Sequence, residues 1–147
     1  MKILLQRVTQ ASVTVDDAEV SRIDAGLLVF LGLEQGDNSA IAEKLLQRVL
    51  AYRMFADEAG RMNLSVVDRA GSVLLVPQFT LAADTAQGRR PGFSCAMPAS
   101  EAGRLYAFCL DFLVAQHPRG TVAGGVFGAD MQVGLVNDGP VTFMLSS

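Results

Sequence analysis

The sequence predicts an α+β fold in which two helices pack on a mainly antiparallel, barrel-like β-sheet. Three observations predict this fold. Strand-length apolar segments fill the first third of the chain, two later stretches have the periodicity of amphipathic helices, and further strand-like segments close the chain. A length of 147 residues without an internal repeat or linker predicts a single domain over residues 1–147.

The first third of the chain is predicted to form consecutive strands. Met1–Val8 and Ala11–Val15 alternate loosely between apolar and polar side chains, which predicts two strands or one long bent strand. An acidic turn at residues 16 and 17 leads to a short strand over Glu19–Ile23. Leu27–Leu33 is almost continuously apolar at strand length, so a buried strand is expected there.

The middle of the chain predicts a helix and then a strand. Asn38 and its neighbours supply a loop and an N-cap for a helix that continues to about Phe55. One face of this helix is apolar and consists of Ile41, Ala42, Leu45, Leu46 and Val49. A short edge segment is expected over Asn63–Val67, followed by a strand over Ser72–Val76 and a loop over Ala82–Gly92.

A second helix is predicted to begin near Pro98 and to end near His117. Its apolar stripe consists of Ala102, Leu105, Tyr106, Cys109, Phe112 and Leu113. The glycine-rich stretch Thr121–Gly128 is expected to be a loop, and two strands are expected over Met131–Val136 and Val141–Leu145.

Composition and charge exclude several classes of protein. The chain has no apolar run near the ~20 residues that span a bilayer, and its start lacks a cleavable signal sequence, so we expect a cytoplasmic protein without membrane contact. Cys95 and Cys109 have no metal-ligand or framework spacing and are expected to be unpaired. No phosphate-binding glycine motif is present either, and neither a metal nor a cofactor is predicted. A net charge of −3 argues against wrapping a long phosphate backbone but permits binding one end of an RNA.

Two stretches combine strand-like residues with polar corners. In Leu74–Leu81 an apolar strand runs into Pro77, which has no N–H, so the amides that follow need other partners and are able to hold a carbonyl or an oxyanion. The stretch Asn137–Thr142 contains Gly139–Pro140. The cis form of a peptide bond has a low free-energy cost only before proline, so a cis bond is possible here. An ordinary tight turn is the alternative.

Side-chain catalysis finds little support in the sequence. His117 is expected to be solvated or to cap a helix, because no partner for a catalytic triad is evident. Cys95 lacks a neighbouring histidine signature. Thr80 is the one hydroxyl in the first corner, and without a base its expected role is to satisfy nearby backbone groups. Main-chain groups therefore remain as the candidates for chemistry.

The two corners carry a family resemblance. The chain resembles the D-aminoacyl-tRNA deacylases, also described as D-Tyr-tRNA deacylases, over essentially its whole length. The family motifs are Ser-Gln-Phe-Thr-Leu and Asn-x-Gly-Pro-Val-Thr, which match residues 77–81 and 137–142 here. Shorter stretches also look like the family's: residues 6–8, 11–13, 62–64, 81–85, 90–94 and 129–131.

The resemblance implies hydrolysis of the ester in D-aminoacyl-tRNA, and in glycyl-tRNA mischarged on tRNA-Ala, as a form of chiral proofreading. It implies a homodimer that binds the 3′ end of aminoacyl-tRNA and needs no cofactor. Gln78, Phe79 and Thr80 match the catalytic motif, with the amides of Phe79 and Thr80 as oxyanion donors and the 2′-hydroxyl of the RNA as an assistant.

The resemblance also implies roles for residues elsewhere in the chain. Gly139 and Pro140 match a cis Gly-Pro unit that reaches across the two-fold axis and excludes L-amino acids, and Arg7 matches the residue that holds it. Phe127 and Met131 are candidates for contact with the terminal adenosine, with a core role as an equal alternative.

One position departs from the family pattern, and two other functions stay open. Pro77 stands where the family has serine, so the contact of that hydroxyl is missing; proline here resembles a related animal deacylase that tolerates a small L-amino acid. A non-catalytic nucleic-acid-binding dimer is suggested by Arg89 and Arg90. A hydrolase with Thr80 as nucleophile is the other alternative.

Overall fold

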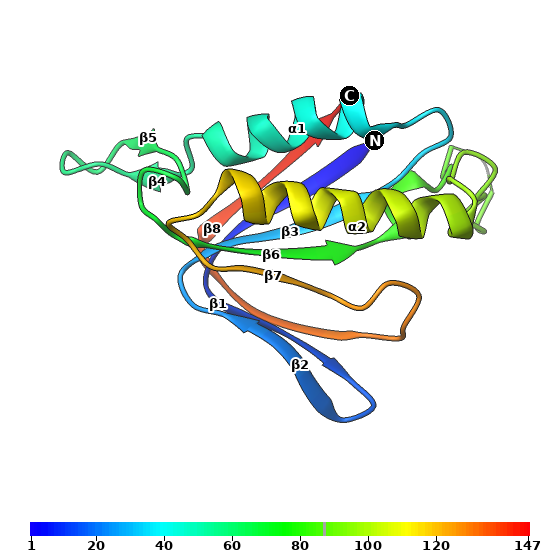
Figure 1. Cartoon of the computed structure of the whole chain (residues 1–147), viewed down its shortest axis with the longest axis horizontal. Coiled ribbons are helices and arrows are strands. Elements are labelled where there is room, and N and C mark those ends of the chain that lie inside the picture. The colour runs from blue at the N-terminus through cyan, green and yellow to red at the C-terminus, as the bar shows by residue number, and fades with distance from the viewer. Residues whose placement is uncertain (87) are drawn as a thin grey trace.

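The computed structural model describes residues 1–86 and 88–147. Figure 1 shows both helices on one side of a curved sheet, with the N-terminus and the C-terminus close to each other beside α1. The elements in chain order are β1 (Lys2–Val15), β2 (Ala18–Ile23), β3 (Gly26–Gly32), α1 (Ser39–Ala51), β4 (Phe55–Ala56), β5 (Met62–Leu64), β6 (Ser72–Pro77), the 3-10 helix η1 (Phe79–Ala82), α2 (Ala99–Gln116), β7 (Val122–Gly124) and β8 (Gln132–Ser146).

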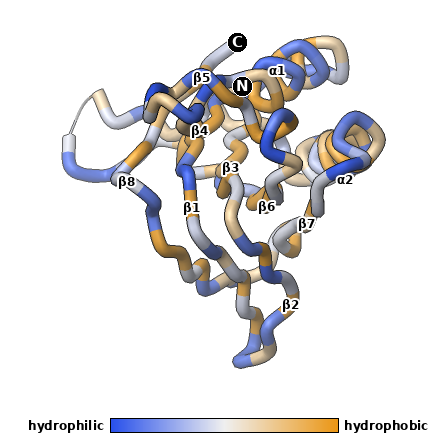
Figure 2. Tube along the Cα trace, turned by 90° about the vertical axis from the view of Figure 1, so that its left-hand side faces the viewer, coloured by the Kyte–Doolittle hydropathy of each residue, from blue (hydrophilic) through white to orange (hydrophobic). Residues whose placement is uncertain are grey.

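The sheet is assembled around β1, which pairs with three other strands. Its first half pairs with β3, its second half with β2, and its opposite edge with β8, all antiparallel. β6 runs parallel to β3 on one side and to β7 on the other. The sheet curls so that β2 approaches β6 and β7, which gives the barrel-like shape of Figure 2. This confirms the predicted α+β class with a barrel-like sheet and two helices, and adds two parallel pairs.

Two apolar clusters lie on opposite faces of the central strands. In β3, Leu27 and Val29 belong to the cluster under the two helices, whereas Leu28 belongs to a second cluster with Leu74 of β6. Because successive side chains of a strand point to opposite faces, this alternation buries β3 and β6 on both sides. The nearly continuous apolar sequence of the two strands is the result of that double burial.

Helix α1 begins as predicted and ends earlier than predicted. The Asn38 side chain caps its first turn, but the helix ends at Ala51 rather than near Phe55. Tyr52 has an extended backbone, and Met54 is fully buried in the main core. Phe55 then starts the small hairpin of β4 and β5. The chain therefore leaves the helix four residues before the predicted end, and this places the Met54 side chain in the core.

The C-terminal part of the chain also differs from the prediction. The two predicted strands are one continuous strand, β8, that runs through Gly139–Pro140. Part of the glycine-rich stretch that was predicted to be a loop forms β7, which is held by parallel pairing with β6. Helix α2 follows Pro98 and carries Tyr106 and Cys109 on its buried face, which confirms the predicted position of its apolar stripe.

Within the two described ranges, neither helix is both long enough and apolar enough to span a lipid bilayer.

Candidate active site

A cavity of about 350 Å³ lies where β6 ends, beside the first polar corner. Its walls come from the ends of β3 and β6, from η1, from the start of α2 with the segment before it, and from the loop between β7 and β8. The residues that line it are Leu31, Leu33, Pro77, Gln78, Phe79, Ala96, Met97, Ala99, Ala102, Phe127, Gly128, Ala129 and Met131. Four residues predicted for the site, Gln78, Phe79, Phe127 and Met131, therefore lie around one cavity.

The corner between β6 and η1 is fixed by β3. Pro77 pairs with Leu31 as the last residue of the parallel ladder, and the Gln78 N–H then donates to the Leu31 carbonyl oxygen at 2.7 Å. A Cβ at Gly32 would lie 2.7 Å from the Cβ of Leu81. Glycine at the end of β3 therefore lets η1 pack directly against it, and this contact turns the chain sharply after Gln78.

The first two amides of η1 are those of Phe79 and Thr80. Within the turn, the N–H of Leu81 is bonded to the Gln78 carbonyl oxygen at 3.2 Å. Among the residues that the structure describes, we find no acceptor for the amides of Phe79 and Thr80. The first N–H groups of any helical turn lack partners inside the turn, so these two are available to a carbonyl or an anionic oxygen.

Two aromatic side chains form the outer rim beside η1. The ring of Phe79 is 62% exposed, and its centroid lies 5.1 Å from that of Phe93. Thr80 is exposed next to it, and the Gln78 Nε2 donates to the Thr80 Oγ1 at 2.6 Å. The expectation that the Thr80 hydroxyl satisfies backbone groups is wrong, because its partner is the Gln78 side chain. The Gln78–Thr80 contact holds the corner in one conformation.

The opposite rim carries Phe127 and Met131. Phe127 is 37% exposed and rests on α2, where its ring contacts Tyr106 with a centroid distance of 5.9 Å. The Met131 sulfur accepts a hydrogen bond from the Val126 N–H at 3.3 Å. Phe127 is thus partly solvent-accessible and partly packed, whereas Met131 is half-buried. Both side chains present apolar surface to the cavity.

None of the described residues that line the cavity has a titratable side chain. A reaction in this cavity therefore relies on main-chain donors, on positioning and on groups that a substrate brings with it. His117 is only 1% exposed at the end of α2, where its Nε2 lies 2.7 Å from the Gly71 carbonyl oxygen. Of the two roles expected for His117, the solvated one is wrong and the capping one is confirmed, because His117 is the C-cap of α2. Its ring joins the helix to the loop before β6.

The cysteines and acidic residues also lie away from a catalytic arrangement. Cys95 and Cys109 are both free, as predicted. Burial raises the pKa of the Cys109 thiol to about 12, which suits a core residue. In the described part of the chain, no three His, Cys, Asp or Glu side chains gather as metal ligands.

The second motif forms a projection on β8 rather than a cavity. The pairing of β1 with β8 goes from Val8–Asn137 to Gln6–Thr142, so residues 138–141 bulge out opposite the single residue Arg7. The peptide bond between Gly139 and Pro140 is cis, and both residues are exposed. The chain here is a short polar loop that stands out from the strand.

Side-chain hydrogen bonds hold the projection at its base. The Arg7 Nε donates to the Asp138 carbonyl oxygen at 2.9 Å, and its Nη1 donates to the Met54 carbonyl oxygen at 2.6 Å. The Asn137 Oδ1 accepts from the Val141 N–H at 2.7 Å, which closes the loop. The arginine therefore links the projection to the chain beyond α1, and the asparagine sets its width.

The projection lies far from the cavity of its own chain. The sheet register places Arg7 level with Leu27 and Val73, whereas the cavity begins at Leu31 and Pro77. Four residues along a strand correspond to roughly 13 Å. Figure 1 shows the same separation, with the end of β6 on one side of the sheet and the middle of β8 on the other. The structure brings the first motif together with Phe127 and Met131, but not with Gly139, Pro140 or Arg7.

Two contributors to these sites were not predicted from the sequence. The Tyr106 hydroxyl lies 3.0 Å from the carbonyl oxygen of Leu75 and 2.9 Å from that of Gly125, so it joins the ends of β6 and β7 behind Phe127. Burial raises its pKa to about 12, so it stays a neutral donor. In the sequence, only the position of Tyr106 on the apolar stripe of α2 pointed to this role. For Asn137, the sequence did indicate a role in closing the projection, because the second motif places this residue two positions before Gly139.

Comparisons with known proteins agree with this geometry. The profile of the D-Tyr-tRNA(Tyr) deacylase family matches residues 4–146. A D-aminoacyl-tRNA deacylase of Xanthomonas oryzae pv. oryzae is 55% identical over 145 residues, with 99% of each chain covered. One of Saccharophagus degradans is 51% identical over 146 residues, again with 99% of each chain covered. The chain belongs to the D-Tyr-tRNA(Tyr) deacylase family.

Solved structures show the same fold. The c-Myc DNA Unwinding Element Binding Protein superposes with a TM-score of 0.95 at 40% identity, covering 100% of this chain and 99% of that one. A probable eukaryotic D-amino acid tRNA deacylase superposes with a TM-score of 0.84 at 17% identity, covering 98% and 97%. At that identity the second likeness concerns the fold alone.

Proposed function

We propose that this protein hydrolyses the ester bond between a D-amino acid and the 3′-terminal adenosine of tRNA, and the same bond in glycyl-tRNA mischarged on tRNA-Ala. Family membership and the names of relatives more than 50% identical support the reaction. The observation that carries the proposal is the pair of amides at Phe79 and Thr80, which lack acceptors at the edge of a cavity without titratable side chains. Such a site suits an activated ester and is poorly suited to a stable amide.

In this proposal the corner of β6 and η1 holds the ester. The carbonyl oxygen of the substrate accepts hydrogen bonds from the amides of Phe79 and Thr80, which stabilise the negative charge that develops as water attacks. The vicinal 2′-hydroxyl of the RNA positions or activates that water, so no protein base is required. Gln78 keeps the corner rigid through its 2.6 Å contact with the Thr80 hydroxyl.

The terminal adenosine is proposed to rest on the opposite rim. Adenine stacks well on an aromatic face, and Phe127 offers a partly exposed ring that α2 holds in place. Met131 supplies a polarisable apolar surface beneath it. The cavity of about 350 Å³ is within the usual range for a small-molecule site and is large enough for the end of the RNA, not its helix.

Chiral selection is proposed to come from a second copy of the chain. Gly139 and Pro140 project into solvent and lie far from the cavity of their own chain, so they complete a site only across a two-fold axis. Main-chain groups of this projection exclude the side chain of any L-amino acid, whatever its chemistry, and leave the D direction open. Arg7 holds the projection at its base.

The surface of β8 supports such a homodimer. β8 pairs with β1 alone in the described structure, so its outer edge has free hydrogen-bonding groups. Leu135, Val136 and Met144 are exposed along it, with Met144 61% exposed. Exposed apolar side chains on an open strand edge are typical of a protein–protein interface.

A deacylation assay tests the proposed function. Purified protein is incubated with D-Tyr-tRNA and L-Tyr-tRNA, and with glycyl-tRNA-Ala, at equal concentrations of enzyme. We expect the D and glycyl esters to be hydrolysed and the L ester to persist. Equal rates on the D and L esters, or no reaction with the D ester, would contradict the proposal.

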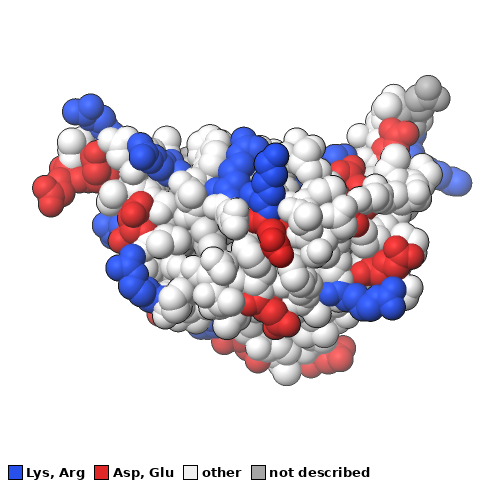
Figure 3. Space-filling model, turned by 45° about the horizontal axis from the view of Figure 1, so that its top comes forward, with Lys and Arg blue, Asp and Glu red and all other residues white. Residues whose placement is uncertain are grey.

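A second candidate is a nucleic-acid-binding protein without catalysis. The name of the structural relative that is 40% identical, a DNA Unwinding Element Binding Protein, favours it. Arg89 and Arg90 are exposed, in the stretch of chain shortly before Phe93. However, Figure 3 shows basic and acidic side chains interspersed over the visible face rather than a continuous basic surface. This candidate predicts binding to RNA or DNA that does not depend on an aminoacyl group.

A further inference from the structure

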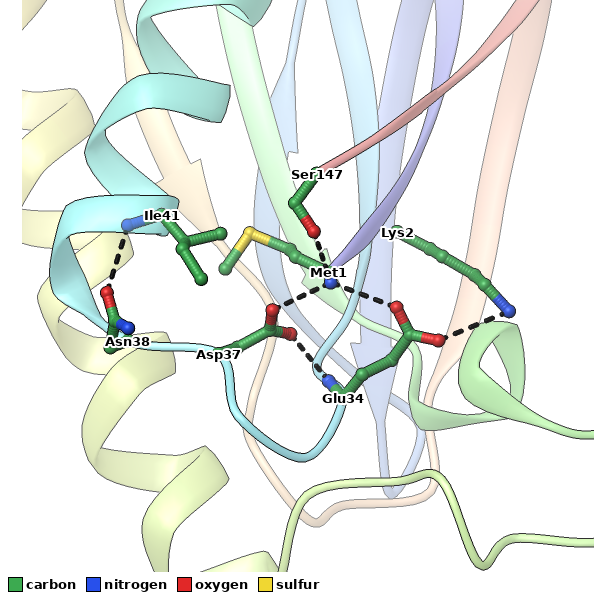
Figure 4. Close-up of polar contacts among 7 residues, drawn as sticks. All are labelled: Met1, Lys2, Glu34, Asp37, Asn38, Ile41 and Ser147. Atoms are coloured by element: carbon green, nitrogen blue, oxygen red, sulfur yellow. Dashed lines mark hydrogen bonds and ion pairs between the residues drawn. The ribbon is translucent and has the colours of Figure 1, made fainter.

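The α-amino group of Met1 lies between two carboxylates at the junction of β1, β3 and α1 (Figure 4). It is 2.7 Å from the Asp37 Oδ1 and 2.9 Å from the Glu34 Oε2, and it donates to the Ser147 Oγ at 2.9 Å. The side chains of Met1 and Asp37 are 0% and 4% exposed. This ion pair is therefore almost fully removed from water.

The same two carboxylates define the loop between β3 and α1. The Asp37 Oδ2 accepts from the Glu34 N–H at 2.7 Å, so one carboxylate binds both the ammonium and the start of the loop. The Lys2 Nζ lies 3.3 Å from the Glu34 Oε1. A nearly buried charge is tolerated only while its partner stays in place, so the loop of residues 34–37 has little freedom to shift.

This loop in turn holds the segment before α2. The Gln35 N–H donates to the Cys95 carbonyl oxygen at 2.9 Å, and the Gln35 Nε2 donates to the Ser94 carbonyl oxygen at 2.6 Å. The Met97 N–H donates to the Leu33 carbonyl oxygen at 3.1 Å. Residues 94–97 are thus tied by two hydrogen bonds to the loop and by a third to Leu33, just before it.

The tied segment is one wall of the cavity. Ala96 and Met97 line it, and Phe93, just before the segment, contacts the Phe79 ring. Contacts therefore run from the Met1 ammonium through Asp37 and the loop to a wall of the cavity that Phe79 also lines.

We propose that the Met1 ammonium, Glu34 and Asp37 form a positioning centre for this wall, and that it sets the rate of deacylation without touching the substrate. This inference rests on the proposed function of the cavity. A displaced wall leaves the ester mispositioned against the amides of η1, and small errors of position at a reacting group are costly. The centre then couples the chemical state of the amino terminus to the active site.

Two changes and two matched controls test the positioning centre. Asp37→Asn removes the main partner of the ammonium, and a Gly-Ser extension before Met1 moves the charge away. The controls are Glu43→Gln and Glu58→Gln, which change exposed carboxylates on α1 and in the turn between β4 and β5. Intact mass first verifies an unmodified Met1 amine in the starting protein. We expect kcat/KM for D-Tyr-tRNA to fall about 10- to 100-fold in both test proteins and to be unchanged in both controls.

The combined variant shows whether the two changes act on one interaction. Because both remove the same ion pair, their effects on kcat/KM should not add when Asp37→Asn is placed in the extended protein. Full additivity would overturn the proposal. So would test proteins that melt at a lower temperature but retain normal kcat and KM well below that temperature.

Hydrogen exchange provides a readout that does not depend on activity. The amides of Gln35 and Met97 form the ties between loop and wall, and they should lose protection in both test proteins while the amides of β3 keep theirs. Unchanged protection at both amides would overturn the positioning role. If the unmodified protein is inactive, the proposed function fails, and the exchange result alone decides whether the centre holds the wall.

Discussion

The two motifs of this chain are built in opposite ways. The corner at Gln78–Thr80 is concave, surrounded by apolar side chains, and offers main-chain N–H groups. The projection at Gly139–Pro140 is convex and polar, and it is held at its base by Arg7 and Asn137. The first motif lines a cavity but has no group that distinguishes D- from L-amino acids. The second motif is a rigid projection with no cavity beside it. In the proposed function each motif supplies half of a site, and the other half is placed on a second copy.

The means of fixing each half also differ. The corner is held by the sheet itself, through the Gln78 N–H bond to Leu31 and the close packing at Gly32. The projection is held by long side-chain contacts, above all those of Arg7, whose side chain is 14% exposed. Changes in the corner are therefore expected to affect chemistry, and changes in the projection are expected to affect selection.

The largest expected effect comes from removing one amide in the corner. Phe79→Pro removes an N–H at the first position of η1, where proline is compatible because Gln78 already has a non-helical backbone. Its matched control, Phe79→Ala, removes the exposed ring and keeps the N–H. We expect kcat for D-Tyr-tRNA to be about 10²- to 10³-fold lower in the proline variant than in the alanine variant, as for loss of an oxyanion donor. Circular dichroism checks that both variants fold.

Equal kcat values for the two Phe79 variants would show that this amide is not a catalytic donor. Thr80→Ala completes the series, since it removes the hydroxyl and keeps the second amide. We expect it to retain activity within about tenfold, because only the contact with Gln78 is lost. A loss of many orders of magnitude would instead support Thr80 as a nucleophile.

A smaller effect, on selection as well as rate, is expected at the projection. A Cβ at Gly139 would lie 2.7 Å from both the main-chain nitrogen and the Cγ2 of Val141, and the φ of +153° is unfavourable for other residues. Gly139→Ala should therefore shift the projection and lower kcat/KM for D-Tyr-tRNA about 10- to 100-fold. It should also reduce the ratio of the hydrolysis rate of the D ester to that of the L ester. Initial rates on both esters measure this.

Mixing two defective proteins tests whether the halves come from different copies. When Gly139→Ala and Phe79→Pro proteins exchange subunits, each mixed dimer has one intact site. In that site the corner comes from the Gly139→Ala chain and the projection comes from the Phe79→Pro chain. Random exchange should restore about a quarter of the normal activity. A mixture that stays as inactive as its components, although mass spectrometry detects mixed dimers, would place both halves of the site within one chain.

The same contrast explains what the sequence predicted. The corner follows from local chemistry, because Pro77 ends a ladder and an apolar strand precedes it, and the central strands follow from continuous apolarity. The assignment of Gly139, Pro140 and Arg7 came from the family resemblance, since the separation of Arg7 from the cavity depends on sheet register. Register is a long-range property that a local pattern does not contain.

The errors in the predicted elements have the same origin. β7 consists of three residues in a glycine-rich stretch and is held by its pairing with β6. The strand propensity of its own residues therefore does not predict it. Helix α1 stops at Ala51 because Met54 enters the core, which depends on what lies beneath it. β8 continues through Pro140 because β1 spans the bulge with one residue, Arg7. The Tyr106 hydroxyl bonds could not be predicted, since they require the ends of β6 and β7 to be adjacent.

The smallest expected effect concerns charges outside both halves. Arg89 and Arg90 are exposed in the stretch that leads to Phe93, and in the proposed function they contact phosphates just inside the 3′ end of the tRNA. Arg89→Ala and Arg90→Ala should each raise KM for D-Tyr-tRNA a few-fold, leave kcat unchanged, and reduce the slope of log KM against log salt by about 1. Arg22→Ala, on β2 and paired with Glu19, is the matched control and should change neither quantity. A different result would favour the nucleic-acid-binding candidate. In that case the two arginines are required for binding to RNA that carries no amino acid, and the protein does not deacylate D-Tyr-tRNA. Such a result would contradict an active site shared between two copies of the chain.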